Sequence, residues 1–197
     1  MPLVRRADSI LAVVDTQPGF VEHPAMGAGE RSEAARTVER IAWLARLAAW
    51  LDVPVLATEE EPQREGHTHA RVKACLPRDA PVVPKKIFAL TGCREAFAEL
   101  RASDRRIVVL TGFETDVCVA QSAVALVDAG YRVVVPADAT YTAREDDHRR
   151  GIARMREAGV EIHSSKSVTY EWLEDVDTAA AILERASTEF DVLPYRL

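Results

Sequence analysis

The stretch from Ile107 to Ala139 constrains the fold more than any other part of the sequence. It begins with a β-branched run at Ile107 to Leu110, which is typical of a strand that is buried on both faces. The residues that follow predict a turn at Thr111 to Thr115 and an Ala- and Val-rich helix from about Val117 to Ala129. A second buried strand is expected at Tyr131 to Val135. This order predicts a parallel β-α-β unit with a right-handed crossover.

Cys118 lies in the first turn of the predicted helix, just after the first strand ends. Ligands bind at this edge of open α/β sheets. A helix N-terminus stabilises negative charge, so the position favours a nucleophilic cysteine with a lowered pKa. The free N–H groups of the first turn can also hold an oxyanion. An inert buried cysteine is the alternative, and position alone does not decide between the two.

Length and charge limit the class of protein. A chain of 197 residues that is 48% hydrophobic can bury one full core, so we expect a single domain over residues 1–197. The net charge of −6 argues against a nucleic-acid partner. Cys75, Cys93 and Cys118 are odd in number and irregularly spaced, which favours reduced thiols in a cytoplasmic protein. We found no apolar run of signal-peptide or membrane-spanning length and expect no membrane contact.

The rest of the chain alternates strands with helices. This order predicts a three-layer α/β/α fold, with a doubly wound, mostly parallel, six-stranded and Rossmann-like sheet. The expected strands are residues 10–14, 53–57, a short strand that begins at residues 82–83, and residues 107–110, 131–135 and 160–163. The expected helices are residues 32–51, 94–101, 117–129, 145–158 and 169–186.

Two further strand ends carry polar residues. Asp15 follows the first strand directly. A carboxylate in such a place is costly unless it is paired or used, so Asp15 is either a general base or a turn aspartate. Lys85 and Lys86 follow the third strand, and neighbouring residues of an extended chain point to opposite faces. Either one of them faces the site or both lie on the surface.

The loop after the second strand offers the ligand types of a metal site. It contains His67, His69 and the acidic run Glu59 to Glu61. Zinc sites usually take their ligands from regular spacings, which this Gly-containing loop lacks. A solvated loop is the favoured interpretation, and we predict neither a metal nor a cofactor.

Three motifs resemble those of the isochorismatase-like cysteine hydrolase family. They are G-F-E-T-D-V-C-V around Cys118, A-V-V-D-T-Q-P-G-F around Asp15 and K-K-I-F at the two lysines. The resemblance covers nearly the whole chain, from about Ile10 to Leu173. In the family the lysine is followed three residues later by an aromatic residue, so Lys85 with Phe88 is preferred to Lys86.

The resemblance implies roles for five residues. Asp15 is expected to take the thiol proton, Lys85 to orient Asp15 and favour the thiolate, and Cys118 to attack a carbonyl carbon. The family also has a cis peptide before the residue that matches Glu114, so the bond from Phe113 to Glu114 is expected to be cis. The N–H groups of Glu114 and Cys118 would then form an oxyanion hole.

The same resemblance implies a hydrolase that cleaves a C–N bond in a small amide, or a related carbonyl compound, through a thioester. The run T-E-E-E-P-Q-R-E-G lacks the D-x-H pattern of nicotinamidases and resembles the metal-free branch with unassigned substrates. The alternatives are a vinyl ether hydrolase of the isochorismatase type and a catalytically silent binding or assembly module. The presence of all three expected catalytic residues argues against a silent module.

The resemblance also suggests a substrate pocket and an assembly. The candidate pocket walls are Phe20, Thr58, Glu59 and Phe88. A homo-oligomer, a dimer or larger, is expected to form through the helices that carry Trp43, Trp50 or Trp172.

Overall fold

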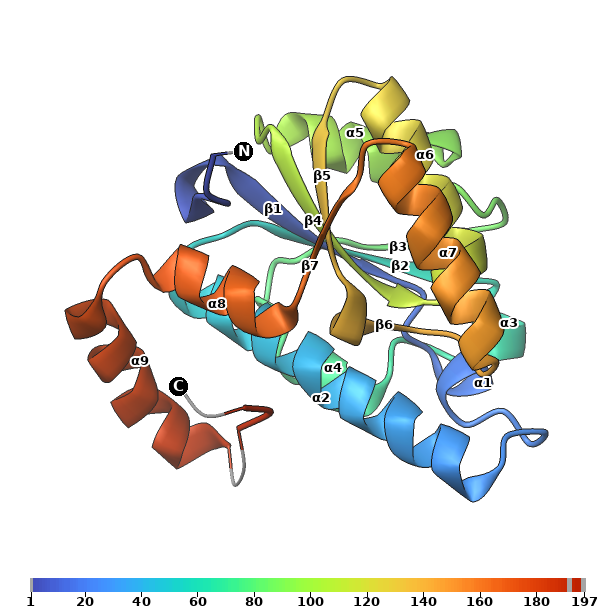
Figure 1. The fold of residues 1–197 in the computed structure, drawn as a ribbon, viewed down its shortest axis with the longest axis horizontal. Coiled ribbons are helices and arrows are strands. Elements are labelled where there is room, and N and C mark those ends of the chain that lie inside the picture. The colour runs from blue at the N-terminus through green and yellow to red at the C-terminus, as the bar shows by residue number, and fades with distance from the viewer. Residues whose placement is uncertain (1, 191–192, 196–197) are drawn as a thin grey trace.

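The computed structural model describes residues 2–190 and 193–195, and a parallel sheet forms its centre (Figure 1). Within these residues the strand order is β3-β2-β1-β4-β5-β7, every pair is parallel, and short β6 pairs with the end of β4. The doubly wound α/β fold predicted from the sequence is therefore confirmed. The strands are β1 (Ser9–Val14), β2 (Val55–Glu60), β3 (Val82–Lys85), β4 (Ile107–Phe113), β5 (Arg132–Pro136), β6 (Thr140–Tyr141) and β7 (Glu161–His163).

Helices cover both faces of the sheet, as Figure 1 shows. One layer contains α2, α4 and α8, against which α9 packs, and the opposite layer contains α5, α6 and α7. The helices are α1 (Pro18–Val21), α2 (Ala28–Trp50), α3 (Pro62–Glu65), α4 (Ala70–Lys73), α5 (Arg94–Ala102), a π-helical segment (Thr115–Val119) that leads into α6 (Ala120–Asp128), α7 (Glu145–Glu157), α8 (Ser165–Leu173) and α9 (Val176–Glu189).

The central strand β1 explains why both layers form. Every one of its residues is buried. Leu11 and Val13 point into the core under α2, whereas Ile10, Ala12 and Val14 point into the core under α6. The uninterrupted apolar run of the sequence thus supplies two hydrophobic cores from one strand.

The turn expected at Thr111 to Thr115 is wrong. Strand β4 continues to Phe113, and the helical segment begins at Thr115 as a π-helix. Gly112 keeps its place in the strand with a φ of +127°, because a Cβ atom there would lie 1.9 Å from the carbonyl oxygen of Val14 on β1. The glycine therefore permits close strand contact and does not mark a turn.

Other boundaries also differ from the expectation. Helix α2 begins at Ala28, where the Glu30 side chain accepts a hydrogen bond from the Gly27 N–H, and Ser32 lies inside it. Strand β2 begins and ends later than predicted, and the loop after it contains α3 and α4. The helix expected at residues 169–186 is two helices, because Asp175 accepts a hydrogen bond from the Thr178 N–H and starts α9.

The tryptophans mostly pack the inside of the chain. Trp43 and Trp172 are fully buried, and the Trp43 ring contacts that of Phe190 at a centroid distance of 5.5 Å. These two indoles therefore stabilise the core under α2 and are not available to a partner subunit. Among the described helices, none combines the length and the apolar character that a membrane span requires.

Candidate active site

Three side chains from distant segments meet at the carboxyl edge of the sheet. Asp15 follows β1 directly, Lys85 ends β3, and Cys118 is the fourth residue of the π-helical segment after β4. The Lys85 Nζ lies 2.5 Å from Asp15 Oδ2 and 3.6 Å from Cys118 Sγ. All three residues are at most 3% exposed. The structure thus brings together the three residues that the sequence had singled out.

Lys85 and Lys86 have opposite surroundings. The side chain of Lys85 is fully buried, whereas that of Lys86 is 85% exposed and lies 3.9 Å from Glu61. The alternation of an extended strand therefore sends one lysine into the site and the other into solvent.

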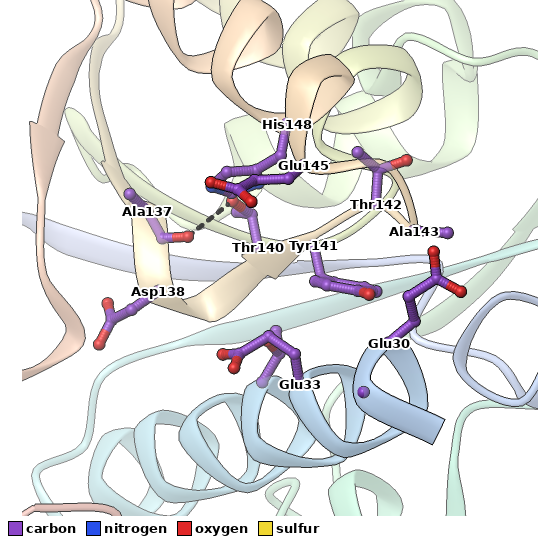
Figure 2. Close-up of a pocket in the computed structure, with 12 residues that line it drawn as sticks. Glu30, Glu33, Ala137, Asp138, Thr140, Tyr141, Thr142, Ala143, Glu145 and His148 are labelled. Carbon is purple, nitrogen blue, oxygen red and sulfur yellow. Dashed lines mark hydrogen bonds between the residues drawn. The ribbon is translucent and has the colours of Figure 1, made fainter. Parts of the chain in front are cut away.

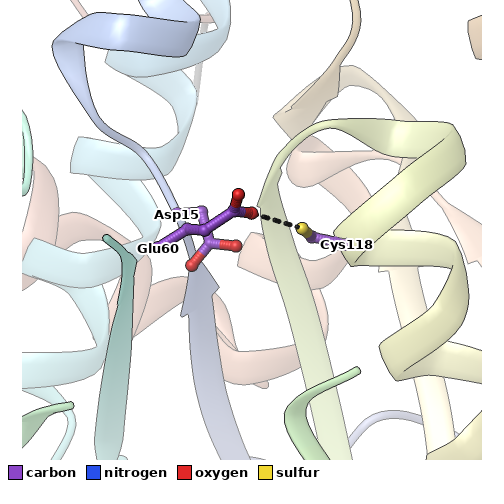
Figure 3. A group of neighbouring side chains, drawn as sticks. All are labelled: Asp15, Glu60 and Cys118. Carbon is purple, nitrogen blue, oxygen red and sulfur yellow. Dashed lines mark hydrogen bonds between the residues drawn. The ribbon is translucent and has the colours of Figure 1, made fainter. Parts of the chain in front are cut away.

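A fourth residue, Glu60, belongs to the same cluster, and the sequence reasoning missed it. The Cys118 thiol donates a hydrogen bond to Glu60 Oε2 over 3.3 Å, as Figure 3 shows. The same oxygen lies 4.0 Å from Lys85 Nζ. Glu60 ends β2, which runs between β1 and β3, so its place follows from the strand order. The sequence did contain a signal for Glu60. Residues two apart in a strand point to the same face, so Glu60 shares the face of Thr58, which was already a candidate pocket residue.

Local backbone geometry fixes the positions of Asp15 and Glu60. Asp15 has a φ of +45°, so it turns the chain away from the sheet immediately after β1. Gln17 then reaches across to β2, where its side chain accepts from the Glu60 N–H at 2.7 Å and donates to the Glu60 carbonyl at 2.9 Å. The Glu60 backbone is thereby held independently of its own side chain.

The helical segment that carries Cys118 is also tightly held. The peptide bond between Phe113 and Glu114 is cis. The Glu114 carbonyl accepts hydrogen bonds from the N–H groups of both Val117 and Val119. The N–H of Cys118 lies between these two donors, at the start of the helix. Short π-helical segments of this kind are common at functional sites.

Burial and charge set the protonation of the cluster. Burial raises the pKa of Asp15. Burial opposes the charge of Lys85, but Asp15, Cys118 and Glu60 together outweigh it and raise the Lys85 pKa. Burial and then Asp15 raise the pKa of Cys118. The thiolate expected from the helix N-terminus is therefore wrong for the resting protein, because the surrounding carboxylates and the loss of water favour the neutral thiol.

The four candidate pocket walls have different surroundings. Thr58 donates a hydrogen bond to Asp15 Oδ1 at 2.8 Å, so it supports the cluster. Glu59 faces the other side of β2, where it accepts from the N–H and the hydroxyl of Thr68. Phe88 is 47% exposed. Phe20 alone of the four lines a cavity described in the next paragraph.

Two adjoining cavities lie beside this edge. The one with Phe20 has a volume of about 370 Å³ and reaches Glu114. A second, of about 430 Å³, lies between α2, α7 and β6, where Glu33 and His148 face each other across it (Figure 2). The two share Glu30 and Ala143 in their walls. Neither is lined by the cluster itself, and the smaller one approaches it through Glu114.

Metal-binding side chains occur together at one place in the described residues. Asp15, Glu60 and Cys118 offer ligand atoms that all lie within 4.8 Å of one another. The Lys85 ammonium already lies within 4.0 Å of all three side chains. It supplies the positive charge there and would repel a metal cation.

The histidines of the loop after β2 do not join this group. The His67 ring lies 2.9 Å from Glu59, and His69 lies 3.6 Å from Glu22. The two rings thus contact different carboxylates, and the structure provides no shared site for them among the described residues.

A buried thiol, an ammonium and carboxylates at the carboxyl edge of a parallel sheet define a candidate hydrolase centre. Residues 9–167 match the family description "Isochorismatase domain", and the chain belongs to the isochorismatase family of hydrolases. Isochorismatase domain-containing protein 2 of Xenopus laevis is 31% identical over 168 residues, which are 85% of this chain and 77% of that protein.

Solved structures share the fold. MAR1 ribonuclease from Caenorhabditis elegans superposes with a TM-score of 0.81 and 24% identity, over 96% of this chain and 94% of that chain. The YcaC gene product of Escherichia coli, an octameric hydrolase of unknown specificity, gives a TM-score of 0.80 and 19% identity, over 96% of this chain and 98% of that chain. At these identities the likeness concerns the fold alone.

Proposed function

We propose that this protein is a cysteine hydrolase that cleaves a small amide or a related carbonyl compound through a thioester. Cys118 is the nucleophile, and Asp15 and Lys85 are the buried charged pair that activates it. The observation that carries the proposal is the Lys85 ammonium, which lies 2.5 Å from the Asp15 carboxylate and 3.6 Å from the thiol sulfur. A buried cation beside a thiol stabilises the negative charge that develops on sulfur during attack.

The reaction begins with a neutral thiol. Because burial raises the pKa of Cys118, free thiolate is scarce at neutral pH, and the proton must pass to a neighbouring carboxylate as sulfur attacks. The carbonyl carbon gains the S–C bond, and its oxygen takes the electron pair. When the C–N bond breaks, the leaving amine takes the proton and a thioester remains. Water then hydrolyses the thioester and restores the thiol.

The oxyanion needs hydrogen-bond donors in this geometry. We assign that role to the N–H groups of Glu114 and Cys118. The N–H groups at the start of a helix have no partners within the helix and point toward the bound group. Removing one such donor typically costs about 100-fold in rate.

The charge of the centre favours a particular kind of substrate. Asp15 and Glu60 place two carboxylates beside the one ammonium of Lys85. An uncharged or cationic amide is compatible with this balance, whereas a substrate with its own carboxylates would be repelled. The charge balance therefore favours amide cleavage over the vinyl ether alternative, since isochorismate itself carries two carboxylates.

A screen of uncharged and cationic small amides and N-carbamoyl compounds tests the proposal. The protein is expected to release amine or ammonia from at least one compound and to accumulate an acyl adduct on Cys118 that mass spectrometry detects. The variant Cys118→Ala should keep the fold and lose both signals. Full turnover by Cys118→Ala, or an adduct located on Cys75 or Cys93 alone, would refute the assignment of the nucleophile.

A further inference from the structure

The two carboxylates beside Cys118 have different partners. Asp15 uses Oδ1 to accept from the Thr58 hydroxyl at 2.8 Å and Oδ2 to pair with Lys85 at 2.5 Å. Glu60 instead accepts the hydrogen bond of the thiol itself, over 3.3 Å. Asp15 also has an oxygen within 4.8 Å of the sulfur, and both carboxylates help to raise the pKa of the buried thiol. Glu60 is the carboxylate that accepts a hydrogen bond from the thiol at a defined distance of 3.3 Å.

We propose that Glu60 is a catalytic base of this enzyme that receives the Cys118 proton directly, while Asp15 holds the Lys85 ammonium against the sulfur. The inference rests on the proposed hydrolase function and divides the acid-base work among three groups where the family resemblance implies two. Its geometric warrant is that a base must lie within hydrogen-bond reach of the proton it takes.

The proton balance of the cycle closes with this assignment. The S–H proton moves to Glu60 Oε2 as the S–C bond forms and the carbonyl electron pair moves to oxygen. The protonated Glu60 then gives that proton to the leaving amine as the C–N bond breaks. In the second half, Glu60 takes a proton from the attacking water and returns it to sulfur as the S–C bond breaks. No other reactant than substrate and water is required.

The charges around Glu60 support a direct transfer. Burial disfavours a negative charge on the sulfur, and Asp15 on one side adds to this effect. Transfer to Glu60 neutralises one carboxylate at the moment the sulfur becomes negative, so the total charge of the cluster does not change. The Lys85 ammonium faces both the Glu60 carboxylate, 4.0 Å from Oε2, and the Cys118 sulfur.

Two more charged residues face Glu60 from other elements. Arg64 on α3 lies 3.6 Å from Oε1 and is well exposed, so solvent screens its charge. Glu114 lies on the side of the π-helical segment, and Glu60 contributes to raising the pKa of its carboxyl group. Around Oε2, the oxygen nearest the thiol, the close partners are thus the Cys118 sulfur at 3.3 Å and the Lys85 ammonium at 4.0 Å.

A substitution at Glu60 can separate this role from a structural one. The Gln17 side chain holds both the N–H and the carbonyl of Glu60, so Glu60→Gln should leave the backbone in place. A glutamine keeps the shape and can still accept a hydrogen bond, but it cannot take a proton. Glu61→Gln is the matched control, because Glu61 is the next residue and pairs with Arg64 and Lys86 away from the thiol.

The first readout is the pH profile of Cys118 alkylation by iodoacetamide, resolved by peptide mass spectrometry. With an internal base, wild-type Cys118 and Glu61→Gln should give a nearly flat rate between about pH 6 and about pH 8. In Glu60→Gln the rate should be lower at neutral pH and should rise by about tenfold per pH unit, as expected for a thiol that must ionise to solvent.

The second readout is turnover of the best amide from the screen. Loss of a general base lowers kcat/KM by about 100-fold or more, so Glu60→Gln should show that loss while Glu61→Gln stays near wild type. Glu60→Asp keeps the charge but withdraws the carboxylate by about one C–C bond, or ~1.5 Å. It should recover part of the flat profile, and it serves as the test variant if the glutamine variant does not fold.

The outcomes separate the two proposals. Profiles and turnover of Glu60→Gln within twofold of Glu61→Gln would overturn the role of Glu60 and leave the hydrolase proposal intact. If wild-type Cys118 shows neither a flat profile nor any amide turnover, and reacts like Cys75 and Cys93, the hydrolase proposal fails first and the role of Glu60 fails with it.

Discussion

Replacing Lys85 by methionine tests whether the buried cluster is held together by its single ammonium. The Lys85 side chain has no exposed surface, and its nearest partner is Asp15 at 2.5 Å. Methionine fills a similar volume without the charge. It leaves the Asp15 carboxylate buried beside Glu60 with no cation between them.

The expected cost follows from the geometry. At 2.5 Å and an effective dielectric constant of about 20, Coulomb attraction amounts to about 7 kcal/mol, and desolvation of the two ions cancels several kcal/mol of it. Removing one partner of a buried pair typically costs about 3–5 kcal/mol, because an uncompensated charge remains. A domain of ordinary stability, about 5–15 kcal/mol, would become marginal. We therefore expect Lys85→Met to lower the free energy of unfolding by about 3–5 kcal/mol.

Urea unfolding followed by tryptophan fluorescence measures this loss, and the double variant Lys85→Met/Asp15→Asn identifies its cause. Asparagine removes the unpaired charge and keeps the shape, so the double variant should recover most of the lost stability. A double variant no more stable than Lys85→Met would refute the argument, because the loss would then come from packing.

The same pair of variants has a predictable pH dependence. Burial already raises the pKa of Asp15, and without Lys85 the largest opposing influence is gone. A carboxyl group whose pKa is raised on folding stabilises the protein below its unfolded pKa, and this stabilisation is lost as the pH rises through the folded pKa. Lys85→Met and the double variant should therefore be equally stable below about pH 4 and diverge as the pH rises. A stability gap that is the same at every pH would contradict the reasoning.

Two shorter predictions concern the neighbouring backbone and the outer lysine. Gly112→Ala should unfold at a much lower temperature than wild type, because its Cβ would lie 1.9 Å from the Val14 carbonyl oxygen. Gly130→Ala is the control, with a φ of +89° but open space around it, and its unfolding temperature should fall less. Equal losses in a thermal melt would show that the close contact is unimportant. Lys86→Met should change neither stability nor turnover measurably, since that side chain is 85% exposed; a loss of activity would show that it reaches the substrate.

Much of the fold and the three expected cluster residues could be predicted because the deciding signals are local. The run at Ile107 to Leu110 predicts a doubly buried strand, and Asp15 follows a similar run directly. Parallel strands bring their carboxyl ends to one edge, so residues that follow them meet. Lys85 and Lys86 were distinguished only through the family resemblance, since both continue the same strand.

The missed features depend on the tertiary structure. Gly112 signals a turn by composition, and only the approach of β4 to β1 explains a glycine inside a strand. The raised pKa of Cys118 depends on burial and on Asp15, neither of which is visible at the helix N-terminus that suggested a lowered one. Glu60 stands in a run of three glutamates, which reads as a solvated loop until the end of β2 is known.

The pairing of β2 with β3 explains why two neighbouring glutamates, and two neighbouring lysines, have opposite surroundings. Glu60 is the register partner of Lys85, and the Glu61 N–H donates to the Lys85 carbonyl at 3.1 Å. With this register one Glu–Lys pair faces the thiol, and the next pair, Glu61 and Lys86, faces solvent at 3.9 Å. A slip of one residue in either strand would turn its inward charge outward. The proposed roles of Glu60 and Lys85 at the sulfur therefore depend on this strand register.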